Sequence, residues 1–289
     1  MVREPIGAKW LIELENMPDV AYAKRVGIAR RTVEVIHQTV KNYVMHRELI
    51  AFLLISRHGF NPLYGYSYRQ QRYLYWKVLS QLFQRFYPRF VRFPTRTENR
   101  ALHHLHMSLD GTCVRTHRGS YHKRATKHHQ RAKWRAYKFR HKYAGNFQVA
   151  FCAELNRIVA VYGIYPGKAA DISAIRNSNF FCLLRTLDMG SYTVECDAGY
   201  PAEPVYLHAC CKKPRHGELP IESQIRNALI SSRRWIIEVI FRRMKIFRVL
   251  RDIMQSYNKS RMGRLFKVVA AIVSADLKTR PLKRHCKKP

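Results

Sequence analysis

The sequence predicts an α/β protein in which a mixed-sheet core follows a small all-α domain. Three observations support this prediction. Residues 1–95 carry helical periodicity, alternating apolar residues begin after residue 103, and a long helical pattern covers 221–250. The 289 residues suffice for one sizeable core with a small accessory domain.

The N-terminal region contains two short helical patterns separated by Gly27. The first follows Pro18, with Asp19 as the expected cap, and the second runs from about residue 30 to 44. A glycine turn between two short helices, at about 18–44, is the layout of a helix-turn-helix, although an ordinary helical hairpin has the same pattern. As a helix-turn-helix it would present to DNA the residues that start the second helix: Arg30, Arg31 and Thr32.

The second region, 103–275, alternates strand and helix patterns. Residues 104–109 alternate and end at Asp110, and 147–153 and 158–165 form an expected hairpin. A helix over 171–185 follows, then a strand over 192–196 that ends at Asp197, and then the long helix. This order is the layout of an RNase-H-like mixed-sheet core.

The charge of the chain indicates its partner. With 53 Lys and Arg against 19 Asp and Glu, the formal net charge is +34. A polyanion, in particular nucleic acid, fits this charge better than a membrane surface, because no long basic amphipathic helix stands out. No apolar run approaches the roughly 18 residues that span a bilayer. The seven cysteines form no CxxC pair, which favours reduced thiols over a disulfide framework or a zinc site. A basic RNA-binding or ribosome-associated protein explains the charge but not the three carboxylates described next.

Three carboxylates stand at the ends of apolar runs: Asp110, Asp197 and Glu238. Either aspartate alone could simply start a turn, and Glu238 could form a surface ion pair with Arg234. On a helix, however, Arg234, Glu238 and Lys245 fall within about 40° of one another, as a polar stripe on an apolar helix. Three carboxylates from separate elements suit two divalent cations that bind a phosphodiester, and they predict metal-dependent cutting or rejoining of DNA.

A basic, aromatic insertion at about 113–145 follows the first carboxylate. From Gly111 to Ala153 the chain has 11 Lys and Arg, five His and no acidic residue. We expect Lys133, Arg135 and Lys138 to bind the phosphate backbone there, although a disordered loop is the alternative. Asp171 is expected to be a helix cap without a part in the chemistry.

Four short motifs in order resemble the Harbinger-type DDE transposases, the nucleases derived from them and related bacterial insertion-sequence transposases. The resemblance covers about 91–250. The motifs are Asp110-Gly111-Thr112, then Pro166-Gly167 through Asp171 with Ala170 where the family has His, then Asp197-Ala198-Gly199-Tyr200-Pro201, and then Asn227, Arg234, Glu238 and Lys245 in register.

The resemblance implies hydrolysis of DNA phosphodiesters at transposon ends, followed by strand transfer. Asp110, Asp197 and Glu238 would be the catalytic residues and would hold two Mg²⁺ (or Mn²⁺) ions, while Arg234 and Lys245 would orient Glu238 or bind phosphate. Double-stranded DNA, a homo-oligomer on DNA and a separate DNA-binding helper protein are the implied partners. The alternative is a domesticated relative, weak or inactive in catalysis, that binds DNA.

The end of the chain, 276–289, is expected to be a basic tail. In a eukaryotic host it could act as a nuclear import signal, and a solvated tail is the alternative.

Overall fold

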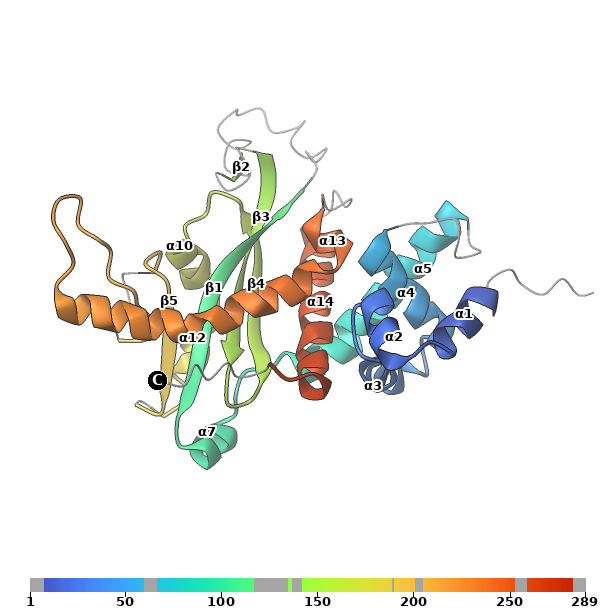
Figure 1. Cartoon of the computed structure of the whole chain (residues 1–289), viewed down its shortest axis with the longest axis horizontal. Helices are drawn as coiled ribbons and strands as arrows, with labels where there is room; N and C mark the ends of the chain where they lie inside the picture. Colours follow the sequence, from blue (N-terminus) through green and yellow to red (C-terminus); the bar gives the residue numbers. More distant parts are fainter. Residues whose placement is uncertain are drawn as a thin grey trace, which may run out of the picture.

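The computed structural model describes residues 8–59, 67–116, 135–136, 142–188, 190–200, 205–252 and 259–282. A helical N-terminal lobe lies beside a sheet-based lobe, and helix α14 (Lys259–Thr279) stands between them (Figure 1). Within these ranges, no helix combines the length and the apolar character that crossing a membrane requires.

The N-terminal lobe is built around α4, the most buried of its helices. Its residues Leu49 to Ile55 are each at most 2% exposed, because the run is apolar on all sides and neighbouring helices surround it. The lobe consists of α1 (Ala8–Glu15), α2 (Asp19–Val26), α3 (Arg30–Val40), α4 (His46–His58), α5 (Tyr68–Gln81), a π-helical turn (Leu82–Phe86) and α6 (Tyr87–Phe90).

The predicted pair of short helices with a tight glycine turn is confirmed as local structure. Gly27 has φ of 100°, and its N–H donates to the Ala23 carbonyl at 2.8 Å, which closes α2 in a left-handed cap. Asp19 is not the N-cap that the sequence predicts, because Pro18 occupies that position. Asp19 instead forms an ion pair with Arg30 at 3.0 Å.

The sheet-based lobe contains a mixed sheet in which β4, β3, β1, β5 and β6 lie in that order. Strand β1 pairs antiparallel with β3 and parallel with β5, and the short β2 pairs with the start of β3. The strands are β1 (Leu105–Arg115), β2 (Arg135–Ala136), β3 (Lys142–Cys152), β4 (Arg157–Pro166), β5 (Tyr192–Cys196) and β6 (His208–Ala209). The mixed sheet with helices is compatible with the RNase-H-like core that the sequence predicts.

Helices cover both faces of this sheet. On one face, α10 (Asp171–Arg176) and α11 (Phe180–Leu184) pack against Leu105, Met107 and Leu109 of β1. On the other face, α12 (Ile221–Lys245) and α14 pack against alternate residues of β3, such as Val149 and Phe151. Helix α7 (Arg96–Leu102) leads into β1, and α13 (Arg248–Arg251) follows α12. Alternation along β1 therefore directs odd-numbered side chains to α10 and even-numbered ones to α12.

Two predicted elements differ in their bounds. Strand β1 does not end at Asp110 but continues to Arg115, because β3 remains paired with it as far as Ala144. The helix expected over 171–185 is two helices, since Asn177 and Ser178 bond back to the carbonyls of Ser173 and Ile175 and interrupt it.

Helix α14 joins the two lobes and has no counterpart in the sequence-based prediction. It contacts β4 on one side and α3, α5 and α6 on the other. The ring of Phe266 stacks on Phe147 of β3 at 3.9 Å between centroids, and Ser274 Oγ donates to the Phe90 carbonyl at 2.9 Å. Residues 276–279, expected in a separate basic tail, form the last turn of this helix, and 283–289 lie outside the described residues.

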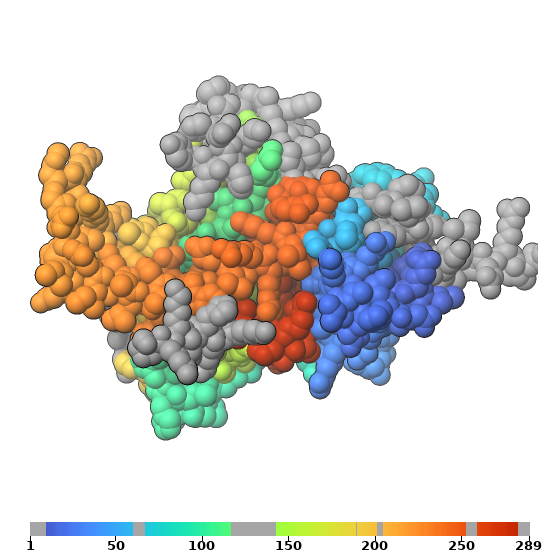
Figure 2. All heavy atoms as spheres, in the orientation of Figure 1, coloured from blue at the N-terminus to red at the C-terminus, as the bar shows by residue number. Residues whose placement is uncertain are grey.

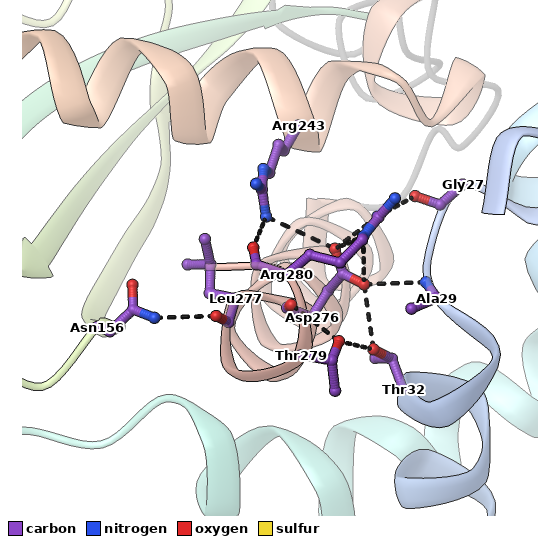
Figure 3. A network of polar contacts seen from close by, with 9 residues as sticks. All are labelled: Gly27, Ala29, Thr32, Asn156, Arg243, Asp276, Leu277, Thr279 and Arg280. Carbon is purple, nitrogen blue, oxygen red and sulfur yellow. Dashed lines mark hydrogen bonds and ion pairs between the residues drawn. The ribbon is translucent and has the colours of Figure 1, made fainter. Parts of the chain in front are cut away.

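At the end of α14, Asp276 is the centre of a buried polar network (Figure 3). Its Oδ1 accepts hydrogen bonds from the Ala29 N–H at 3.0 Å and from Thr32 Oγ1 at 3.1 Å. Arg280 donates to the same carboxylate at 2.6 Å and also to the Gly27 carbonyl. The start of α3 is therefore fastened to the C-terminal helix.

Candidate active site

Asp110 lies within β1 and faces α12. Its Oδ1 accepts the N–H of Gly111 at 2.7 Å, and its Oδ2 pairs with Arg234 Nη2 of α12 at 3.1 Å. The side chains of Asp110 and Arg234 are 15% and 16% exposed, so the pair is shielded from solvent. Arg234 was expected to orient Glu238 or bind phosphate, whereas here it contacts Asp110 directly.

Asp197 follows the last residue of β5, next to the strand that carries Asp110. Residues Leu105 to Ser108 of β1 pair in parallel with Tyr192 to Glu195, so both strands run toward the same edge. Asp197 Oδ1 accepts the Gly199 N–H at 2.7 Å, which closes a tight loop. Burial above all, together with the carboxylates of Asp197 and Asp110, raises the pKa of the adjacent Cys196 thiol to about 12, and Arg234 opposes this shift. The charges of both aspartates therefore act on the same thiol.

Glu238 lies one helical turn after Arg234 and is exposed on α12. An open pocket of about 330 Å³ is lined by Glu238, Lys245 and Phe241 of α12 and by Asp110 and Gly111 of β1. A second hollow, of about 460 Å³, adjoins Glu238 on the side of Arg234 and Trp235. In Figure 2 the orange surface of α12 runs across this side of the molecule. The polar stripe that the sequence predicts on α12 therefore faces the strand of the first aspartate.

Asn227, the first residue of the fourth motif, positions the helix against the sheet. Its side chain accepts from the Cys211 N–H at 2.8 Å and donates to the Cys211 carbonyl at 2.9 Å. Further along the same helix, Arg233 pairs with the buried Glu195 of β5 at 2.8 Å. These contacts fix α12 beside β5 and so set the side of the sheet on which Glu238 lies.

Asp171 does not have the position that the sequence predicts for it. The N-cap of α10 is Ala170, and Asp171 is the first helical residue, so the expected cap role is wrong. Its Oδ1 accepts from Gln148 Nε2 at 2.8 Å and from Asn146 Nδ2 at 3.2 Å. The signal that could have found it is the pair of amides at alternate positions of an otherwise apolar strand, which must have polar partners when buried.

Residues 109–274 match the family model described as DDE superfamily endonuclease. The chain belongs to this family. The matched segment begins one residue before Asp110 and contains Asp171, Asp197 and Glu238. A DDE endonuclease acts on DNA, so DNA is the substrate. No curated protein and no solved structure shows significant similarity to the chain.

DDE endonucleases use divalent metal ions, and the donor set of this chain fits such ions in its chemistry. Carboxylate oxygens are hard ligands suited to Mg²⁺, and glycines at 111 and 199 leave space between the aspartates that a Cβ would fill. Across the described ranges, however, no three His, Cys, Asp or Glu groups lie close enough to hold one metal ion. Asp110 has Arg234 as its cationic partner instead.

The residues expected to bind DNA through α3 divide into two kinds. Thr32 is fully buried and bonded to Asp276, so it does not face solvent. Arg30 donates to Asp19 and to the carbonyls of Leu14 and Met17, within its own lobe.

Arg31, by contrast, is exposed and lines a cavity of about 1010 Å³ between α2, α3 and the end of α14. Seven of its fifteen lining residues are basic, namely Lys24, Arg30, Arg31, Arg57, Arg243, Lys278 and Arg280.

The basic insertion falls largely outside the described residues. Lys133 and Lys138 belong to that part, and Arg135 is described only as backbone in β2. Their expected contact with DNA stays a prediction.

Proposed function

We propose that this DDE endonuclease is a Harbinger-type transposase that hydrolyses DNA phosphodiesters at transposon ends and performs strand transfer with the freed 3′-hydroxyl. The observation that carries the proposal is the pocket that Asp110 and Glu238 both line. Strand β1, which bears Asp110, lies next to β5, and Asp197 directly follows β5. The four ordered motifs support the Harbinger subtype.

Asp110, Asp197 and Glu238 are the residues that would hold two Mg²⁺ (or Mn²⁺) ions. Bound there, such ions supply Lewis-acid stabilisation of the charge that develops on the phosphate oxygens. Lys245 lines the same pocket as Asp110 and Glu238, and its ammonium group suits a non-bridging phosphate oxygen. Arg234 balances the charge of Asp110 and keeps its carboxylate at the pocket wall.

Positive charge outside the active site would bring DNA to this pocket. The net charge of +34 suits the phosphate backbone, and the basic cavity that Arg31 lines offers one contact surface outside the active site. We further propose a homo-oligomer on DNA, a separate DNA-binding helper protein and, in a eukaryotic host, nuclear localisation.

A second candidate function is a catalytically weak relative that binds DNA. The observation that favours it is the ion pair of Arg234 with Asp110, together with three ligand carboxylates that are not gathered around one point in the described residues. The two candidates differ in whether DNA is cut.

The test is a cleavage assay with the full chain. Supercoiled plasmid carrying the genomic DNA that flanks the coding region is incubated with Mg²⁺ or Mn²⁺, and with EDTA as the control. The transposase proposal predicts metal-dependent nicks at fixed positions and joining of the new 3′ ends to target DNA. Tight binding without any cleavage in either metal would favour the second candidate.

A further inference from the structure

We propose that Asp171 is a fourth carboxylate of the active site, whose Oδ2 binds the divalent cation held by Asp197. The proposal rests on the proposed function. It assigns a role in the chemistry to a residue that otherwise resembles an ordinary first residue of a short helix.

Hydrogen bonds hold one oxygen of the Asp171 carboxylate in place. Oδ1 accepts from two side-chain amides, Gln148 at 2.8 Å and Asn146 at 3.2 Å. Gln148 is fully buried and accepts in turn from the buried Tyr200 hydroxyl, which belongs to the second carboxylate motif. Hydrogen bonds from Asn146 and Gln148 thus fix one oxygen, while Oδ2 accepts no hydrogen bond from the residues that the structure describes. A carboxylate fixed through one oxygen is oriented to offer the other.

Two glycines, Gly111 and Gly199, leave space for this carboxylate. A Cβ on Gly111 would lie 2.4 Å from Asp171 Oδ1, a distance that no real side chain tolerates. A Cβ on Gly199 would lie 3.3 Å from Asp171 Oδ2 and 2.8 Å from Asp197 Oδ1. Asp171 Oδ2 and Asp197 Oδ1 therefore both lie beside the Cα of Gly199, just after the end of β5.

Three carboxylates act electrostatically on Tyr200. Burial raises the pKa of Tyr200, and the carboxylates of Asp171, Asp110 and Asp197 raise it further. Like charges gathered around one buried phenol repel one another, and a divalent cation removes that repulsion. Arg234, which pairs with Asp110, is one cation that offsets part of this negative charge.

The alternative explanation is that Asp171 is purely structural and only connects α10 to β3 through its hydrogen bonds. Both explanations predict lower activity when Asp171 is changed, so activity cannot separate them. Affinity for the metal alone can separate them, because a purely structural contact contributes to stability, whereas a ligand contributes to metal binding.

The experiment titrates Mn²⁺ into the full chain by calorimetry and records melting temperatures with EDTA. Asp171→Asn nearly preserves shape, and we expect its Mn²⁺ affinity to fall by at least about tenfold. Its melting temperature in EDTA should be unchanged or higher, because one repelling charge is gone. Asp188→Asn is the control, since Asp188 pairs with Arg96 and Arg100 on the surface, and its Mn²⁺ affinity should equal that of the wild type.

Unchanged Mn²⁺ affinity in Asp171→Asn would overturn the proposal, above all if the melting temperature falls. Gln148→Leu is the second variant: it keeps Asp171 but removes the shorter of the two hydrogen bonds to Oδ1, and Mn²⁺ affinity should again fall. A wild type that neither binds Mn²⁺ nor cuts DNA would instead contradict the proposed function. A wild type that does both, beside an Asp171→Asn protein of equal affinity, would contradict this inference alone.

Discussion

At the scale of single residues, the two glycines of the carboxylate motifs decide how closely the acidic side chains gather. Gly111 follows Asp110 directly and lies opposite Gln148 in the β1–β3 register. Because Gly111 lacks a side chain, the carboxylate of Asp171 can reach the backbone of β1 from the α10 face, whereas Asp110 faces α12. A glycine within a strand often marks this kind of close approach.

Gly111→Ala should therefore reduce catalysis. The new Cβ would meet Asp171 Oδ1 at 2.4 Å and Gln148 Nε2 at 2.7 Å, so Asp171 must move. We expect a loss of about 1–3 kcal/mol in stability from overpacking, and a loss in cleavage rate and in Mn²⁺ affinity. Denaturant unfolding, a nicking assay and calorimetry measure these three quantities.

Gly263→Ala in α14 is the matched control. Its Cβ would have only the Gly163 carbonyl within 4 Å, at 3.8 Å, and alanine is favoured over glycine in a helix by up to about 1 kcal/mol. Its cleavage should equal that of the wild type. Full activity in Gly111→Ala would show that the position of Asp171 is unimportant.

The sequence predicts some of these residues and not others for a physical reason. Asp110 and Asp197 each follow an alternating apolar run, and parallel neighbours bring such positions together. Asp171 carries no such local signal, because an aspartate before a helix is far more often a cap, and its partners on β3 are 23 and 25 residues away. Hydrogen bonds of that range depend on the fold.

At the scale of elements, α14 determines how the N-terminal lobe meets the sheet. Asp276 is 1% exposed and accepts from Ala29, Thr32 and Arg280 (Figure 3). Arg243 of α12 approaches the same carboxylate at 3.7 Å. One carboxylate thus joins α3, α12 and α14.

Asp276→Asn should loosen this junction. The amide keeps the shape but leaves two arginines without their charge partner, at a cost of about 2–4 kcal/mol, reduced from the fully buried case because Arg280 is partly exposed. Asp252→Asn, on the surface beside Arg248, should cost well under 1 kcal/mol. Urea unfolding measures both, and equal costs would contradict the assigned role of Asp276.

Helix α7 supplies a pH-dependent contact at the entry to β1. Hydrogen bonds from Arg157, and also from Arg92 and the Thr95 N–H, hold the pKa of Glu98 well below its usual range. Arg157 pairs with both carboxylate oxygens, at 3.0 and 2.9 Å. Since the folded pKa lies below the unfolded value, the interaction stabilises the protein fully above about pH 5, and this stabilisation disappears as pH falls toward the folded pKa.

Glu98→Gln should lower the free energy of unfolding near neutral pH and flatten its decline below about pH 5. Denaturant unfolding at a series of pH values measures the slope. A variant whose stability declines in acid as steeply as that of the wild type would exclude Glu98 as a source of the dependence.

Element prediction succeeds where the signal is local. The glycine turn between α2 and α3 and the β3–β4 hairpin follow from residues next to one another in sequence. The contacts of α3 do not, because the partner of Thr32 is 244 residues away. At the start of α3, where the sequence suggests a helix that reads DNA, Thr32 is therefore buried against the C-terminal helix while Arg31 stays exposed.

At the scale of the whole molecule, the net charge of +34 governs the encounter with DNA. Phosphate binding releases counterions, so affinity should fall steeply with salt. Changing Lys24, Arg31 and Lys278, which line the basic cavity, to Ala should weaken binding to all sequences alike. The slope against log salt should drop by about one unit for each phosphate that the variant no longer binds.

Arg96→Ala with Arg100→Ala is the comparison, because both residues pair with Asp188 and carry less uncompensated charge. Fluorescence anisotropy at several salt concentrations measures the slopes. Weaker binding to one DNA sequence alone in the cavity variant would contradict a backbone role.

The fold class is predicted from the order of strand and helix patterns, and the composition predicts the polyanionic substrate. The sequence does not predict how the two lobes join. The joining helix, α14, packs against elements of both lobes, and no short sequence motif indicates which elements these are.

If Glu238 on α12 acts with Asp110 and Asp197 in cutting DNA, then removing its charge must slow cleavage. Nicking rates of the flanking-DNA plasmid in Mn²⁺ are measured for wild type, Glu238→Gln and the surface control Asp188→Asn. We predict that Glu238→Gln cuts at least about 100-fold more slowly while it folds and binds DNA normally, and that the control cuts at the wild-type rate. Equal rates for Glu238→Gln and wild type would contradict the claim and place the third carboxylate elsewhere.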